Sequence, residues 1–419
     1  MDKASILIIG CFDSKSEEFS FLYECLKNQN QPMITLNTGI WESQVSFPID
    51  YDSVTVAEKS GTTLTEIRTR ADRGYAVTKM GVGAATLVKE LVDENRIKAV
   101  IGMGGGGGTF LALSAMQPVP LGIPKICLST LAGKNLIRQT KGKDIILMPS
   151  IVDIAGLNSI SKLLIRQAAA AIAAMADLEI AHEDSIAGKI AITMFGNTSA
   201  CAGICSRLLE EKGYEIFVFH ANGIGGQMME TLIGAGRFDA VLDLTTTELA
   251  DELCGGICSA GSNRMEAATK AGIPQLIVPG CLDMVNFGPP DTVPEKYQHR
   301  KLYSWAPDVT LMRTNVEENK ILAQTLVSKP AGSPAAVTVV IPLRGISQID
   351  KEGAVFFEPE SNQALFETIE QQVPGQFELV KADLHINDPA FAELLVDEML
   401  KIIPKEKKIR NLESPAFRD

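Results

Sequence analysis

A run of glycines after an apolar segment is the first part of the sequence whose residue types suit ligand binding. Val100 and Ile101 lie among apolar residues, which predicts a buried strand, and Thr109–Met116 is predicted to be a helix. Between them stand five consecutive glycines, Gly104, Gly105, Gly106, Gly107 and Gly108. Glycines let backbone N–H groups approach an anion closely, and a helix start presents further unpaired N–H groups. We therefore predict a phosphate or carboxylate site here, to which the Thr109 hydroxyl could add a contact.

The glycine run matches neither of two common nucleotide-binding motifs in full. No lysine follows it at the spacing of G-x-x-x-x-G-K-[ST], and Gly102-x-Gly104-x-x-Gly107 fits G-x-G-x-x-G only because glycine is so frequent here. A dehydrogenase site also needs an acidic residue about 20 positions past the loop at a second strand end. Leu121–Lys125 holds none, which argues against that class. The alternative to an anion site is a flexible turn between the strand and the helix.

Polar side chains also follow two other predicted strands of the first half. Asp13 and Lys15 come directly after the first strand, and Thr38 ends the second. Because the carboxyl ends of parallel strands line one edge of a sheet, we expect these residues to bind the same ligand as the glycine run. The alternative for the first segment is a helix start that is capped by one of its serines.

In the second half, five residues suited to acid–base chemistry or to holding an anion occupy the same kind of position. They are His220, Glu248, Asp283, Arg344 and His385, each at or just after the end of an apolar strand. A histidine would act as the acid or base, and Arg344 would hold an anionic substrate together with the helix start at Gly225 and Gly226. Glu248 or Asp283 would orient that substrate. We therefore predict a catalytic site at this edge of a second sheet.

Each of these residues also has a structural interpretation. His220 and His385 suit packed or hydrogen-bonded positions equally well, and Arg344 can form a surface ion pair. Glu248 could supply an oxygen to Mg²⁺, but at its spacing from Asp251 it is more typical of the acidic first turn of a helix. The cysteines have no histidine partners at metal-ligand spacing, so we predict no metal site in the protein itself.

Strands and helices alternate along both halves of the chain, and these elements must position the residues above. The periodicity predicts helices over 73–95 and 157–177, and strands at 5–10, 32–39, 98–103, 124–130, 144–149, 188–195, 215–220, 240–247, 275–279, 309–312, 337–342 and 378–383. This alternation predicts an α/β fold with mainly parallel sheets covered by helices. Residues 42–72 have weak periodicity and are predicted to be a loop with one short helix, as a lid or dimer contact.

Length and charge limit the domain count and the kinds of partner. At 419 residues the chain is long enough for two domains, which we place at 1–184 and 185–405, with a charged tail at 406–419. The net charge of −12 argues against nucleic-acid binding, which needs clustered Lys and Arg. The chain lacks an uninterrupted apolar run of roughly 18 residues and an N-terminal signal-peptide pattern. We therefore expect a cytoplasmic protein with no membrane partner.

Six segments, taken together, resemble the motifs of the tobamovirus-resistance-protein-like ATP-binding family. They are Gly102–Thr109, Val152–Asn158, Phe219–Gly226, Leu242–Leu249, Pro279–Gly288 and His385–Pro389. The resemblance covers nearly the whole chain and implies two Rossmann-like domains, a homodimer, and ATP or a related nucleotide at the glycine run, with Mg²⁺ possible. The family's glycine run usually carries a serine where this sequence has Gly106, so one hydroxyl contact to phosphate is absent.

Two functions fit these observations. The first is a cytoplasmic enzyme that binds a nucleotide in its first domain and performs acid–base chemistry on a phosphorylated or carboxylated small molecule in its second. The other is a nucleotide-dependent regulatory or protein-binding module without catalysis. The resemblance implies this second function, because the family's plant resistance protein binds and inhibits viral replication proteins. It is also favoured by a glycine run that lacks the lysine and arginine of an efficient phosphoryl-transfer site.

Overall fold

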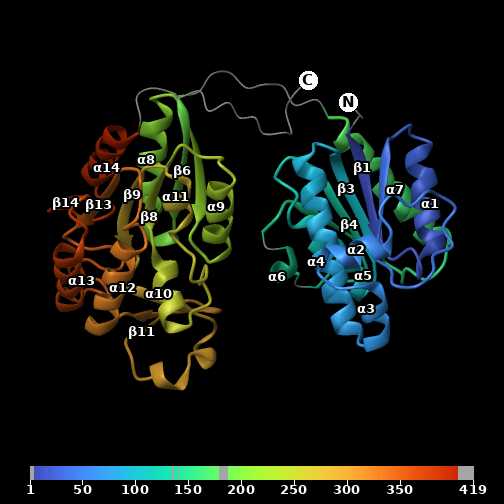
Figure 1. Ribbon diagram of the computed structural model, residues 1–419. Coiled ribbons are helices and arrows are strands. Elements are labelled where there is room, and N and C mark those ends of the chain that lie inside the picture. The colour runs from blue at the N-terminus through green and yellow to red at the C-terminus, as the bar shows by residue number, and fades with distance from the viewer. Residues whose placement is uncertain (1–3, 135, 141, 179–186, 404–419) are drawn as a thin grey trace. The chain divides into compact units, whose positions relative to one another are not determined.

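The computed structural model describes residues 4–134, 136–140, 142–178 and 187–403 (Figure 1). These residues form two compact units, which separate between residues 182 and 183. Unit 1 precedes that point and unit 2 follows it, and each contains its own parallel sheet. The predicted boundary at 184 and 185 and the predicted tail at 406–419 lie outside the described residues.

Unit 1 is built on a five-stranded parallel sheet in the order β2-β1-β3-β4-β5. Its strands are β1 (Ser5–Gly10), β2 (Met33–Asn37), β3 (Ile97–Gly104), β4 (Lys125–Ser129) and β5 (Ile145–Pro149). Side chains of β1 alternate between two cores, with Ile6 and Ile8 on one face and Leu7 and Ile9 on the other. All four are fully buried, which explains why the strand is a continuous apolar run.

Helices cover both faces of this sheet. Those packed against Leu7 and Ile9 include α2 (Ser53–Lys59), α3 (Leu64–Arg70), α4 (Arg73–Asp93) and α5 (Gly106–Met116). Those packed against Ile6 and Ile8 are α1 (Ser16–Lys27) and α7 (Ser159–Ala176), and a short α6 (Ile137–Thr140) follows β4. Unit 1 therefore has a helix layer on each side of a parallel sheet.

Helix α7 is long and apolar enough to cross a membrane when only its length and its mean hydropathy of 1.2 are considered. It also carries Lys162 and Arg166, and its Ile165, Ala169 and Ile172 are buried in the core shared with β1 and β3. The helix therefore serves as a core helix of unit 1.

Residues 42–72 contain two helices, α2 and α3, where the sequence predicted one. Asp52 and Thr63 explain the difference, because each accepts a hydrogen bond from a backbone N–H in the first turn of its helix. These caps mark helix starts that the weak apolar periodicity did not reveal. Val56 of α2 and Ile67 of α3 are buried in the core beneath α4.

Unit 2 is built on a six-stranded parallel sheet in the order β14-β13-β9-β8-β6-β7. Its strands are β6 (Gly188–Met194), β7 (Tyr214–His220), β8 (Ala240–Thr245), β9 (Gln275–Gly280), β13 (Val337–Pro342) and β14 (Glu378–Ala382). One face packs against α8 (Ser199–Glu210) and α14 (Pro389–Ile402). The other packs against α9 (Ile224–Gly234), α10 (Thr247–Cys254), α11 (Ala267–Ala271), α12 (Val316–Ser328) and α13 (Pro359–Gln372). The predicted α/β class with two Rossmann-like, mainly parallel sheets is confirmed.

A small antiparallel sheet adds to unit 2 and differs from the prediction. Its strands are β10 (Met284–Phe287), β11 (Leu302–Ala306) and β12 (Val309–Arg313), in the order β10-β12-β11. The sequence predicted only β12. β10 is buried but only four residues long, and Tyr303 and Trp305 of β11 are exposed, so neither strand forms the longer apolar run that predicts a core strand.

Candidate functional site

The crevice between the ends of β1 and β3 is the position in unit 1 where this topology favours a ligand. The chain leaves β1 toward β2 on one side and later adds β3 on the other side. In open parallel sheets, ligands bind outside the carboxyl ends of strands at such a reversal of strand order. Asp13 and Lys15 follow β1 and the glycine run follows β3, so these predicted residues lie at this crevice.

The glycine run forms the end of β3 and the first turn of α5. The helix begins at Gly106, earlier than the predicted Thr109, and no side chain caps its N-terminus. Its first backbone N–H groups therefore have no partner within the helix. A Cβ atom on Gly104 would lie 2.7 Å from Cα of Gly108, so this tight turn requires glycine there. Gly106 is exposed and a Cβ atom on it would meet open space.

One cationic side chain, Arg73, lies beside this turn, and a second, Lys15, follows β1. Nη2 of Arg73 is 3.4 Å from the position that a Cβ atom on Gly107 would take. Burial raises the pKa of the Cys11 thiol to about 11, and the charges of Lys15 and Arg73 both act in the opposite direction, which places both cations near the end of β1. Neither forms an ion pair within the described part of the chain. Arg73 was not a predicted site residue, because nothing in its local pattern distinguishes it from a helix-start arginine.

The other predicted residues of unit 1 hold the loops in place. One carboxylate oxygen of Asp13 accepts hydrogen bonds of 2.9 Å from the backbone N–H groups of Ile40 and Trp41. Thr38 is buried with its hydroxyl 3.6 Å from Sγ of Cys11. Thr109 is also buried, and its hydroxyl lies 3.1 Å from the Gly104 carbonyl and 2.6 Å from the Ser129 hydroxyl. The Thr109 hydroxyl therefore faces the protein interior and shapes the glycine turn.

The five predicted catalytic residues of unit 2 all follow carboxyl ends of its parallel strands, but their side chains lie in different surroundings. His220 ends β7, and Glu248 lies in the first turn of α10 after β8. Asp283 follows β9, Arg344 follows β13 and His385 follows β14. Only Arg344 and His385 line the groove described below.

The Glu248 side chain is buried and fully hydrogen-bonded within unit 2. It is 1% exposed, and Oε1 accepts hydrogen bonds from the N–H groups of Gly223 and Gly226, at 2.7 and 3.1 Å. Oε2 pairs with Nε of Arg264 at 2.6 Å. The helix start at Gly225 and Gly226, which the sequence predicted to hold a substrate anion, thus holds the protein's own carboxylate.

Arg264 is the centre of a buried ion cluster that the sequence did not predict. Its guanidinium forms two hydrogen bonds to Asp243, at 2.7 and 2.6 Å, and pairs with Glu230 at 3.3 Å in addition to Glu248. The side chain is 1% exposed. It lies in an irregular loop after α10 with no motif around it, so no sequence signal pointed to it.

Asp283 lies in a second buried polar cluster. Its Oδ2 accepts a hydrogen bond of 2.7 Å from the Ser347 hydroxyl. Burial, and then the nearby negative charge of Asp350, raise the pKa of Asp283 to about 7, although Arg313 acts in the opposite direction. Asp283 therefore has the pKa of an acid–base group, but it is fully buried and does not line the groove.

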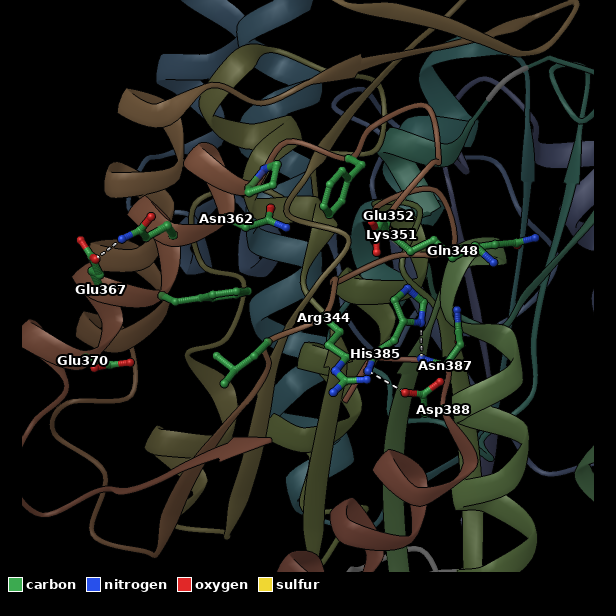
Figure 2. A pocket seen from close by; sticks show the side chains of 15 residues that line it. Arg344, Gln348, Lys351, Glu352, Asn362, Glu367, Glu370, His385, Asn387 and Asp388 are labelled. Carbon is green, nitrogen blue, oxygen red and sulfur yellow. Dashed lines mark hydrogen bonds between the residues drawn. The ribbon is translucent and has the colours of Figure 1, made fainter. Parts of the chain in front are cut away.

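A groove of about 1090 Å³ opens between α13 and the loops after β13 and β14. In Figure 2, Glu367 and Glu370 project from α13 on one side, with Arg344, His385 and Asn387 on the other. Arg344 is exposed and pairs with Asp383 at 2.8 and 2.7 Å, as in the surface alternative. The groove is large enough for a small-molecule ligand.

Both ring nitrogens of His385 are engaged by the loops around it. Nδ1 accepts a hydrogen bond of 3.1 Å from the N–H of Asn387, which makes Nε2 the protonated nitrogen. Nε2 donates to the Ser347 carbonyl at 2.9 Å. His220 differs, because it is exposed at the end of an edge strand with its ring 5.2 Å from that of Phe195. His385 ties two loops together in this conformation, and His220 is the more accessible imidazole.

We expect His385→Ala to lower the free energy of unfolding by about 1–3 kcal/mol, because it leaves the Ser347 carbonyl without its donor. His220→Ala is the matched control and should stay within about 0.5 kcal/mol of the parent protein. Urea unfolding of the three proteins measures both values. Equal stability of His385→Ala and the parent would show that the two hydrogen bonds do not hold the loops.

Comparison with known proteins covers both units. Residues 4–181 match the N-terminal domain of an uncharacterised protein family, UPF0261, and residues 188–403 match its C-terminal domain. A UPF0261 protein of Clostridium tetani is 39% identical over 401 residues, which cover 96% of this chain and 99% of that protein. The ToMV resistance protein Tm-1(GCR237) of Solanum lycopersicum is 35% identical over 442 residues, with coverage of 99% of this chain and 58% of that protein.

A crystal structure of UDP-N-acetylglucosamine 2-epimerase is 11% identical, covers 96% of each chain and has a TM-score of 0.24. That score is too low to support an argument about function. The family assignment rests on the sequence matches to both units, which also confirm the resemblance seen in the six motifs. The chain therefore belongs to the UPF0261 protein family, in which the tomato resistance protein is a relative.

Proposed function

We propose that this protein binds ATP or a related nucleotide through its phosphates at the glycine turn of unit 1. The observation that carries the proposal is the uncapped N-terminus of α5, which faces the β1–β3 crevice with the Arg73 guanidinium beside it. Backbone N–H groups and the positive end of a helix dipole favour a bound phosphate. Arg73 and Lys15 would neutralise further phosphate charge, and a magnesium ion would arrive with the nucleotide.

We propose for unit 2 that the groove beside α13 binds a phosphorylated or carboxylated small molecule. Its volume fits such a ligand, and Arg344 and Lys351 supply positive charge among its lining residues. Of the predicted acid–base residues, His385 reaches the groove but has both nitrogens engaged, so catalysis there would require its loops to move. The protein is then a cytoplasmic homodimeric enzyme of small-molecule metabolism, with no nucleic-acid partner.

The alternative function is nucleotide-dependent regulation of a partner protein. The engaged nitrogens of His385 and the buried position of Glu248 favour it, because neither group is free for proton transfer in the groove. Retention of the same partner proteins on the immobilised chain with and without ATP would count against regulation. Turnover of a sugar phosphate or sugar acid by the purified protein would establish the enzyme.

Two substitutions at one position test the nucleotide site. Gly106 is exposed with open space around it, so Gly106→Ser and Gly106→Asp should both fold. The serine hydroxyl should tighten ATP binding about two- to tenfold by one added hydrogen bond. The aspartate should weaken it by more than about tenfold, because its carboxylate would lie beside the phosphates. Isothermal titration calorimetry with ATP and Mg²⁺ measures the three affinities.

Gly234→Asp is the matched control for these variants, because it adds the same charge at an exposed glycine of α9 in unit 2. It should bind ATP as the parent protein does. ATP binding of parental strength in Gly106→Asp would place the nucleotide elsewhere in the protein. Absence of any ATP binding by the parent would reject the nucleotide proposal itself.

A further inference from the structure

Three buried oxygen atoms at the carboxyl edge of the unit 2 sheet accept no hydrogen bond from any described residue. They are Oδ1 of Asn197, Oδ1 of Asp283 and Oδ1 of Asp350. Their side chains are at most 1% exposed. An unpaired oxygen costs free energy in the protein interior, and an unpaired carboxylate charge costs considerably more. These atoms therefore need a positively charged or donor group that the described residues do not supply.

The three residues converge on one short segment after β13. Oδ2 of Asp350 accepts a hydrogen bond of 3.0 Å from the N–H of Ile346, and Oδ2 of Asp283 accepts one of 2.7 Å from the hydroxyl of Ser347. The carbonyl of Asn197 accepts one of 3.1 Å from the N–H of the next residue, Gln348. Contacts to three consecutive residues bring the loops after β6, β9 and β13 together.

The charges of this cluster do not balance. Asp283 and Asp350 bring two carboxyl groups, and Arg313 is the one cation that pairs with them among the described residues, with Nη2 3.7 Å from Oδ1 of Asp350. The other hydrogen bonds of the guanidinium go to neutral acceptors and therefore compensate no charge. These acceptors are the carbonyls of Phe356, Asp283 and Thr314, the hydroxyl of Thr314 and Oδ1 of Asn362. When both carboxyls are ionised, as we expect above the Asp283 pKa of about 7, one negative charge is left without compensation, so a group that replaces the proton there carries a single positive charge.

We propose that Asp283, Asp350 and Asn197 bind one alkali metal cation, Na⁺ or K⁺, through these three oxygens. Carboxylate and amide oxygens are the ligands of hard cations, and a single charge makes the cluster neutral, whereas a divalent ion would leave an excess positive charge beside Arg313. The cation bridges the loops after β6, β9 and β13.

The bound cation would support the floor of the groove. Asn362, which lines the groove, donates to Oδ2 of Asp350 at 2.7 Å, and Asn387, also in the lining, donates to the carbonyl of Asn197 at 2.9 Å. Nε2 of His385 donates to the carbonyl of Ser347, the residue that contacts Asp283. The cation therefore lies one hydrogen-bonded residue away from a ligand in the groove.

The test compares thermal unfolding of the full chain at pH 8 in choline chloride, NaCl, KCl, MgCl₂ and CaCl₂ at equal ionic strength. We expect NaCl or KCl to raise the midpoint of one transition by about 3–5 °C at tenfold excess over the dissociation constant, relative to choline. Asp283→Asn and Asp350→Asn should each lose this rise, because either variant removes one charge. Asp397→Asn, which removes an exposed carboxylate of α14, should keep it.

Three outcomes would overturn the proposal. Equal midpoints in choline, sodium and potassium would show that no alkali cation binds. A rise with magnesium or calcium alone would contradict the assignment of a single charge. A rise of full size in both Asp283→Asn and Asp350→Asn would place the cation elsewhere.

Discussion

Arg264→Met should lower the free energy of unfolding of unit 2 by about 3–5 kcal/mol, the cost of removing one partner from a buried ion pair. Methionine is apolar and close to arginine in length, so the change removes the charge and the hydrogen-bond donors without opening a large cavity. The parent guanidinium bonds Asp243 through two nitrogens and Glu248 through a third. This loss is larger than the loss expected for His385→Ala, which leaves only a neutral carbonyl without its donor.

The large effect follows from what the substitution leaves behind. Asp243 and Glu248 are 3% and 1% exposed, so water cannot replace the lost cation. Thr193 would still donate to Asp243, and Gly223 would still donate to Glu248, but neither contact carries a charge. Since a buried carboxylate without a cation is costly, both groups would then tend to take up protons or disrupt the packing of α9 and β8.

Urea unfolding at pH 7 measures this loss, and Arg344→Met is the matched control. Arg344 also forms two hydrogen bonds to one carboxylate, but its pair with Asp383 is exposed, so that variant should show no measurable change. Adding Asp243→Asn to Arg264→Met should restore part of the stability, because one uncompensated charge is removed. An Arg264→Met protein as stable as Arg344→Met would contradict the role assigned to the buried cluster.

The central strands of both sheets could be predicted because they are buried on both faces. Such strands are continuous apolar runs bounded by polar turns, and β1 was predicted at the residues it occupies. The antiparallel strands β10 and β11 were missed for two different reasons, since β10 is buried but only four residues long and β11 is largely exposed. The apolar pattern alone therefore identifies long buried strands better than short or exposed ones.

The placement of site residues at strand ends was predictable, but the direction of their side chains was not. Glu248 and His385 both follow apolar strands, yet Glu248 turns inward to Arg264 while His385 bridges two loops. Arg264 lies in an irregular loop. Its three carboxylate partners come from different elements, namely α9, β8 and α10. Pairings of this kind depend on tertiary packing, which local periodicity does not encode.

A second large effect concerns pH, for which we expect the free energy of unfolding to fall as pH rises from 5 to 7. Asp283 has a folded-state pKa of about 7, raised above its ordinary value of 3.8 by burial and then by Asp350. A raised pKa means that the folded state keeps a proton that the unfolded state has released. The stabilisation is fully present below about pH 4 and is lost as pH rises through 7, at about 1.4 kcal/mol per pH unit.

Other titrating groups should not conceal this fall. The pKa of Asp52 and that of Asp177 are lowered by hydrogen bonds, so they add stability as pH rises, but only in a window below about pH 4. Asp251 acts in the same direction as Asp283, because burial raises its pKa to about 7. Between pH 5 and 7 we therefore expect Asp283 and Asp251 each to contribute a loss of about 2 kcal/mol in the free energy of unfolding.

Two amide substitutions separate these carboxyl groups, with urea unfolding at pH 5, 6, 7 and 8 in choline chloride as the measurement. Asp283→Asn should reduce the slope of the free energy of unfolding against pH. It should also raise that free energy at pH 8 by roughly 1–3 kcal/mol, because a neutral amide removes a buried charge and can donate to an unpaired oxygen. Asp251→Asn should reduce the slope but destabilise the protein at pH 8. Both oxygens of Asp251 accept hydrogen bonds from N–H donors, and an amide nitrogen would replace one acceptor. A parent protein whose stability does not change between pH 5 and 7 would show that neither carboxyl group keeps a proton in the folded state.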